Sequence, residues 1–160
     1  MRKDSRGISW IEVIVLLVTV LLIVGIVVPS IWQSKAQINQ NSAVRSIRKI
    51  TAAETIYAQA YDTGFSQSLS ILGPPPDAMP SKDLAGYVDS ELSAGLKEGY
   101  KFVYAAGPRD ANGRIMTYTL NANPVDPGQT GGVFYFVDQT GMIHQNKTQP
   151  ATASDPPIGG

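Results

Sequence analysis

The stretch Ile8–Trp32 decides the fold, and it reads ISWIEVIVLLVTVLLIVGIVVPSIW. From Ile8 to Val28 its twenty-one residues include one charged side chain, that of Glu12. An α-helix rises about 1.5 Å per residue, so this run would extend about 31 Å, which is enough to cross the hydrocarbon core of a membrane. We therefore expect a transmembrane helix. The single carboxylate needs an explanation, because an unpaired charge is costly in an apolar medium.

The segment before the apolar run is short and basic. Arg2, Lys3 and Arg6 precede Gly7, and the run begins directly after that glycine. A basic segment before an apolar helix predicts an N-terminus in the cytoplasm. A cleaved secretory signal is the alternative, with a weak small-residue site at Ser34-Lys35-Ala36. The apolar run is longer than the roughly 7–15 residues of such a signal, which disfavours that alternative.

Gly7, Glu12 and the unbroken apolar helix resemble the processing site of type IV pilins and pseudopilins. In that family a prepilin peptidase cuts after the glycine, the new N-terminus is usually methylated, and the fifth mature residue is a glutamate. The resemblance implies cleavage between Gly7 and Ile8, which makes Glu12 the fifth mature residue. Two residues depart from the family pattern. Ile8 stands where phenylalanine is commonest and Trp10 where leucine is common, and both substitutes are apolar.

Gly25 and Pro29 form the predicted weak point of the helix. Proline has no N–H, so the carbonyl of the residue four positions earlier loses its helical partner. A glycine in a helix interior costs about 1 kcal/mol relative to alanine. Pro29 is the twenty-second mature residue, where the family often carries a proline. Two interpretations stay open: a kinked helix, or a segment that unwinds when subunits pack into a fibre.

The helical pattern continues beyond Pro29 to about Tyr61, and Gly64 is expected to end it. Its second half carries one apolar stripe with three- and four-residue steps, made of Ala43, Val44, Ile47, Ile50, Ala53, Tyr57 and Tyr61. Glu54 lies beside this stripe, within reach of a sheet residue. The apolar and polar faces of this half predict a helix that lies on a protein core.

Four later segments are expected to form strands, at residues 100–104, 115–122, 133–137 and 142–145. The first of them alternates, and the third is strongly apolar. Asn112-Gly113 is a favoured hairpin pair between the first two. Residues 90–96 could form a short helix that buries Leu92 and Leu96. The predicted fold class is α+β: a long N-terminal α-helix, transmembrane in its first half, packed on a four-stranded antiparallel β-meander, pilin-like in layout.

The predicted organisation has six parts. These are a leader at residues 1–7, a transmembrane or filament-core helix at 8–32, an amphipathic helix half at 33–63, a connecting loop at 64–99, a sheet at 100–146 and a flexible tail at 147–160. The chain has no cysteine, so packing and sheet pairing must hold the exported part without a disulfide.

Composition argues against a nucleic-acid binder. The formal net charge is zero, and removal of residues 1–7 would take three basic side chains and one acidic side chain, leaving −2. A general binder of nucleic acid carries a basic surface instead.

Few residues suggest chemistry, and we expect no enzyme, no cofactor and no metal. His144 is the only histidine, which excludes a cluster of several histidines. A calcium site near Asp126 and Asp138 is conceivable, but the spacing matches no calcium loop. Asn146-Lys147-Thr148 fits a glycosylation sequon, a three-residue pattern that is frequent by chance.

The sequence therefore predicts a structural subunit of a type IV pilus-like filament, assembled by packing of N-terminal helices. The assembly residues are Ile8 and Glu12. The resemblance implies a prepilin peptidase and methyltransferase, an inner-membrane assembly platform and other copies of the chain as partners. The precursor would lie in the inner membrane as a single-pass protein. The filament would be extracellular. Two alternatives remain: a pseudopilin of a type II secretion system, which would be periplasmic, and a membrane-anchored periplasmic binding module.

Overall fold

The computed structural model describes residues 9–76 and 79–159, apart from the side chains of residues 24–32. The chain divides into two compact units, Met1–Ser34 and Lys35–Gly160. The helix α1, Trp10–Tyr61, is 52 residues long and contributes to both units. It continues through Gly25 and Pro29 without a break in its helical backbone.

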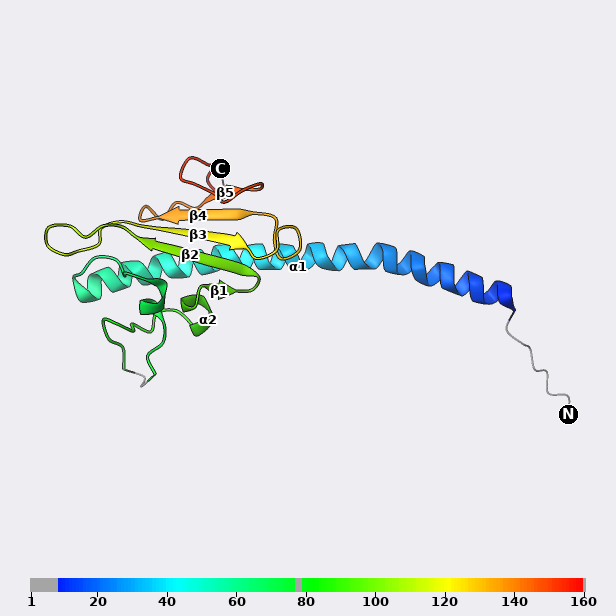
Figure 1. Cartoon of the computed structure of the whole chain (residues 1–160), viewed down its shortest axis with the longest axis horizontal. Helices are drawn as coiled ribbons and strands as arrows, with labels where there is room; N and C mark the ends of the chain where they lie inside the picture. Colours follow the sequence, from blue (N-terminus) through cyan, green and yellow to red (C-terminus); the bar gives the residue numbers. More distant parts are fainter. Residues whose placement is uncertain (1–8, 77–78, 160) are drawn as a thin grey trace. The chain divides into compact units, whose positions relative to one another are not determined.

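The second unit contains a five-stranded antiparallel sheet whose strands follow one another in chain order (Figure 1). The strands are β1 (Leu96–Lys97), β2 (Tyr100–Ala106), β3 (Tyr118–Pro124), β4 (Phe134–Asp138) and β5 (His144–Asn146). Two short helices, η1 (Leu69–Leu72) and α2 (Ser90–Ser93), lie in the connection between α1 and the sheet. In the sheet, each strand after β1 pairs with the strand before it along the chain, as in a meander.

One face of α1 lies on this sheet and forms the core of the second unit. The buried residues of α1 in this core are Ala43, Ile47, Ile50, Ala53 and Tyr57. Leu120 and Val137 are opposite each other on β3 and β4, and neither is exposed. The predicted stripe is thus buried, with Val44 and Tyr61 at its partly covered edge.

The predicted number of strands was wrong: the sheet has five strands, not four. The additional strand, β1, has only two residues, which is too short to show any period. Leu96 lies in this strand and is exposed, whereas the sequence suggested a buried position on a short helix. The turn to β2 consists of Glu98 and Gly99, with φ of 44° and 75°. These angles suit a two-residue hairpin turn, whose twist matches that of the strands.

The fold-class prediction was also wrong about the first half of the long helix, which was expected to cross a membrane. Among the described residues, no helix has an apolar stretch long enough to cross a membrane.

The end of α1 depends on a close approach of two chain segments. The helix ends at Tyr61, and Asp62 follows with φ of 49°, in the left-handed region. Two residues later Gly64 has φ of 73°, and a Cβ there would overlap the backbone of Ile115. The N–H of Phe65 donates to the Ile115 carbonyl at 2.8 Å, so the glycine lets the chain leave the helix beside the sheet.

The C-terminal segment is folded against the sheet and is not the flexible tail expected from its prolines. Ile158 N–H donates to the Ile143 carbonyl, and Gln145 N–H donates to the Pro156 carbonyl, both at 2.9 Å. Ala151 is buried, and its carbonyl accepts from the Asn121 side chain at 2.8 Å. The segment covers the edge of β5, which would otherwise offer unpaired backbone groups.

Candidate assembly surface

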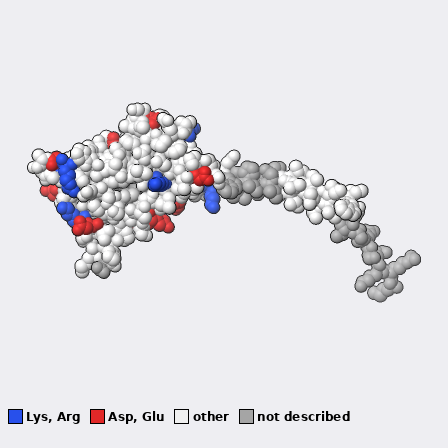
Figure 2. Space-filling model, viewed as in Figure 1, with Lys and Arg blue, Asp and Glu red and all other residues white. Residues whose placement is uncertain are grey.

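The described residues of the first unit expose apolar side chains all round α1. Twelve large side chains there are between 46% and 84% exposed: Trp10, Ile11, Val13, Ile14, Val15, Leu16, Leu17, Val18, Val20, Leu21, Leu22 and Ile23. Because six of them, residues 13–18, follow one another, they cover every direction around a helix of 3.6 residues per turn. The view in Figure 2 shows mainly uncharged surface over this part of the chain. We call residues 10–23 the apolar shaft.

The apolar shaft is a surface that gains free energy when something covers it. Burying one Val, Leu, Ile or Phe side chain contributes about 1.5–3 kcal/mol. Soluble proteins rarely expose a large continuous apolar surface unless it binds something. A helix that is apolar all round is normally enclosed on all sides.

Glu12 takes part in a capping arrangement at the start of the shaft. Ser9 N–H donates to Glu12 Oε2 at 3.0 Å, and Ile11 N–H donates to Ser9 Oγ at 3.3 Å. The contact from Ser9 N–H to Glu12 is one half of a capping box. The Ser9 hydroxyl caps the helix through Ile11 N–H, two residues later, and not through the N–H of Glu12. Farther along, the Thr19 hydroxyl donates to the Val15 carbonyl at 2.7 Å, so it is satisfied within the helix.

The structure describes some of the predicted site residues and not others. Gly7 and Ile8, the predicted processing residues, lie outside the described residues. Glu12 lies in the first turn of α1. Gly25 and Pro29 lie within α1, and the unwinding of this segment in a fibre stays a prediction.

Ser9 is a residue that the sequence reasoning missed. The signal was available, because Ser9-Trp10-Ile11-Glu12 is a serine followed by a glutamate three positions later, directly before an apolar run. That pattern is typical of a helix start.

In the second unit, a buried carboxyl group joins α1 to the loop that follows it. Glu54 has no exposed surface, and its two oxygens accept from Ser66 N–H at 2.8 Å and from the Ser66 hydroxyl at 2.6 Å. Tyr104 on β2 donates to the Ser66 carbonyl at 2.9 Å. Burial raises the pKa of Glu54, and the hydrogen bonds from Ser66 and Tyr104 only partly oppose this. No cation is paired with Glu54 in the described part of the chain.

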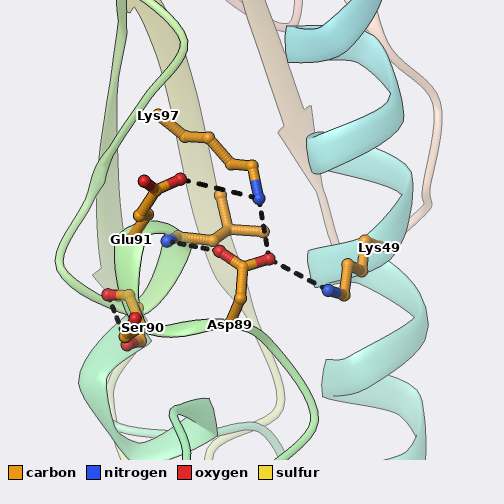
Figure 3. A network of polar contacts seen from close by, with 7 residues as sticks. Lys49, Asp89, Ser90, Glu91 and Lys97 are labelled. Carbon is orange, nitrogen blue, oxygen red and sulfur yellow. Dashed lines mark hydrogen bonds and ion pairs between the residues drawn. The ribbon is translucent and has the colours of Figure 1, made fainter.

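A charged network joins α1 to α2 and β1 (Figure 3). Asp89 Oδ2 lies 3.0 Å from Lys49 Nζ and 2.9 Å from Lys97 Nζ. Its other oxygen accepts from Leu92 N–H at 3.0 Å and so caps α2. Burial alone would raise the pKa of Asp89, but hydrogen bonds from Lys97, Lys49 and Leu92 outweigh it and lower the pKa. Asp89 thus links three elements and anchors the long connection to the helix.

Replacing Asp89 with alanine is expected to destabilise the second unit by about 1.4–3 kcal/mol. The loss combines a helix cap, which contributes about 1 kcal/mol, with two partly exposed ion pairs that contribute about 0.2–1 kcal/mol each. Asp89→Asn is the matched control, since it keeps the capping oxygen and removes only the charge. Urea unfolding at low and high salt measures the difference. If both variants lose the same stability at every salt concentration, the cap contributes nothing.

The other candidates from the sequence take part in local hydrogen bonds. Across residues 9–76 and 79–159, no three His, Cys, Asp or Glu side chains gather as a metal site would require. The Asp138 carboxylate accepts from the Thr140 N–H and hydroxyl, at 2.9 and 2.6 Å. His144 Nδ1 lies 2.6 Å from the Asp155 carbonyl. Asn146, the sequon residue, donates to Asp155 and accepts from Thr148, so both ends of its amide are engaged.

A pocket of about 170 Å³ opens on the second unit near the end of α1. Its lining combines aromatic and charged side chains: Tyr57, Thr63, Phe65, Gln67, Ile71, Lys82, Asp83, Arg109 and Ile115. Arg109 already donates to the Gly113 carbonyl and to Gln67, at 2.8 and 3.0 Å.

Comparison with known proteins gives no match to a family model, a curated protein or a solved structure. The resemblance to type IV pilins therefore depends on Gly7, Ile8, Glu12 and the apolar run, and it stays a prediction.

Proposed function

We propose that this chain is a structural subunit of a type IV pilus-like extracellular filament. Its assembly would follow cleavage between Gly7 and Ile8 by a prepilin peptidase, an enzyme that in the family usually also methylates the new N-terminus. An inner-membrane platform would then add subunits to the fibre. The observation that carries the proposal is the apolar shaft, which exposes apolar side chains in every direction and carries one charge, on Glu12.

The shape of this surface favours several copies of the same chain as its partners. One partner helix covers a single stripe of another helix, about a third to a half of its circumference. A surface that is apolar all round is covered fully only by several neighbours. In a helical filament every copy meets the same neighbours, so one sequence supplies all of them.

Glu12 gives such an assembly its register. Cleavage creates an α-amino group on Ile8, and Glu12 would pair with this group on an adjacent copy. Leaving either charge unpaired in an apolar filament core would cost several kcal/mol. The stagger that joins the two charges is therefore strongly preferred over others.

Imaging of sheared cell-surface material tests the proposal. Filaments that contain this chain support it. A chain that is cleaved and assembles only in the periplasm would instead be a pseudopilin of a type II secretion system. A second unit that still binds its ligand after the shaft is exchanged for an unrelated helix would favour a membrane-anchored binding module.

Substituting Gly7 with leucine is expected to block cleavage, because the family's peptidase acts after a glycine. The intact mass should then correspond to a chain that begins at Met1, and no filaments should form. Ser5→Ala, within the same leader, is the control and should be cleaved normally. A mature-sized product from the Gly7 variant would contradict prepilin processing.

A further inference from the structure

A second pocket, of about 220 Å³, opens on the second unit beside the charged network of Figure 3. One wall belongs to α1, where four lining residues follow one another at three- and four-residue steps and so share one face of the helix: Ser42, Arg45, Ser46 and Lys49. The rest of the lining comes from the connection and the first hairpin: Asp89, Lys97 and Glu98. We call this the serine pocket.

Two residues of the helix wall are buried serines. Ser42 is 5% exposed and Ser46 is 6% exposed. Elsewhere on α1 the hydroxyls of Thr19 and Thr55 donate to the carbonyl four positions earlier, at 2.7 and 3.0 Å. Among the residues that the structure describes, neither serine hydroxyl has such a partner, and both serines line the pocket. Buried hydroxyl groups are normally paired, so these two indicate a group that binds in the pocket.

The serine pocket also has more positive charge and more hydrogen-bond donors than its own acceptors use. Lys49 and Lys97 each make one contact to Asp89, at 3.0 and 2.9 Å, and an ammonium group has three N–H groups. Arg45 has five N–H groups, and no carboxylate oxygen lies within 4 Å of its nitrogens in the described part of the chain. With Glu98, three cations line the pocket against two carboxylates. This balance favours a negative ligand.

We propose that the serine pocket binds a phosphate group, as the free ion or as the ester of a small molecule. A phosphate is negative at neutral pH and accepts through three or more oxygens, whereas a carboxylate accepts through two. The hydroxyls of Ser42 and Ser46 and the guanidinium of Arg45 donate to it from α1, and Lys97 donates from β1. This site goes beyond the proposed function and does not depend on it.

Asp89 competes with the phosphate, because both use Lys49 and Lys97. Asp89→Asn removes the competing charge and keeps the shape of the side chain, so phosphate should bind about threefold to fivefold more tightly. A cation in the same pocket would respond in the opposite direction. Glu91 lies 3.9 Å from Lys97 but is exposed and does not line the pocket, so Glu91→Gln should have a smaller effect.

The test is isothermal titration calorimetry of the detergent-solubilised full chain with inorganic phosphate, at pH 7 and constant ionic strength. Ser42→Ala combined with Ser46→Ala should weaken binding at least about tenfold, because hydrogen bonds to a charged group are lost. Alanine favours a helix more than serine does, so loss of the helix would not explain weaker binding. Arg45→Gln should also weaken binding about tenfold. Arg48→Gln is its matched control, since it removes the same charge from an exposed position of α1 outside the pocket.

Glycerol phosphate, a small phosphate ester, distinguishes the two forms of the ligand. Similar affinities for the ester and the ion assign the pocket to a phosphate group carried by a larger molecule, and binding of the ion alone assigns it to free phosphate. Either result supports the site. No saturable binding of either probe, equal losses from Arg45→Gln and Arg48→Gln, or weaker binding to Asp89→Asn would overturn the proposal.

Discussion

Replacing Glu12 with alanine is expected to reduce filament formation by at least about a hundredfold, because each added subunit would bury an unpaired α-ammonium group. Removing one partner of a buried ion pair typically costs about 3–5 kcal/mol. The helix should remain, since alanine is a good helix former. Cleavage after Gly7 should also remain. Electron microscopy of sheared material, together with the intact mass of the chain, measures both results.

Glu12→Gln is the matched control for this prediction. Glutamine has nearly the same shape and can still accept from Ser9 N–H, but it carries no charge. It should therefore keep the helix start and still lose assembly. Regular filaments from both variants would show that the carboxylate does not set the register.

Replacing Glu54 with alanine is expected to destabilise the second unit by about 3 kcal/mol. The substitution leaves the buried N–H of Ser66 without its acceptor, which costs about 1–3 kcal/mol. It also removes buried methylene groups, at about 0.8 kcal/mol each, whereas the Ser66 hydroxyl can still donate to the Ser68 carbonyl at 3.0 Å. All seven tyrosines lie in the second unit and both tryptophans lie outside it. Near-ultraviolet circular dichroism of the tyrosines during urea unfolding therefore reports on the unfolding of the second unit.

The raised pKa of Glu54 also predicts how the free energy of unfolding depends on pH. Its pKa in the folded chain is raised above the ordinary value of 4.5, so the folded state keeps the proton to higher pH than the unfolded state. The stabilisation that protonated Glu54 contributes is complete below pH 4.5, and it is lost as pH rises through the pKa of Glu54 in the folded chain. Burial raises the pKa of Tyr104 and of Tyr118 as well, which keeps both phenols neutral over this range.

Glu54→Gln separates this effect from other titrating groups. The amide keeps an acceptor for Ser66 and is neutral at every pH, so the fall in stability with rising pH should be smaller than in the wild type. The same pH slope in both proteins would mean that Glu54 is already ionised in the folded chain.

The fold could be predicted from the sequence where a pattern repeats over many residues. The apolar run and the stripe from Ala43 to Tyr61 have several turns each, and α1 covers both. The two residues of β1 cannot show a period, and their pairing depends on a turn at Glu98. The fixed position of the C-terminal segment depends on contacts with residues such as Asn121, which composition does not reveal.

The candidate site was predictable in part for a similar reason. A single carboxylate in an apolar run is conspicuous, so Glu12 could be identified without coordinates. The roles of Glu54 and Asp89 depend on partners 12 and 40 residues away, Ser66 and Lys49, and no local pattern links such positions. The cap at Ser9 follows from a local pattern, a serine followed by a glutamate three positions later, which the sequence shows directly.

The central claim is that copies of this chain cover one another's apolar shaft in a register set by a charge pair. Electron cryomicroscopy of filaments sheared from cells tests this most directly. We expect the side chains of residues 10–23 to be buried among neighbouring copies, with each Glu12 carboxylate within about 4 Å of the Ile8 amino group of an adjacent copy. Filaments in which the shafts of different copies do not touch, or in which the chain still begins at Met1, would contradict the account.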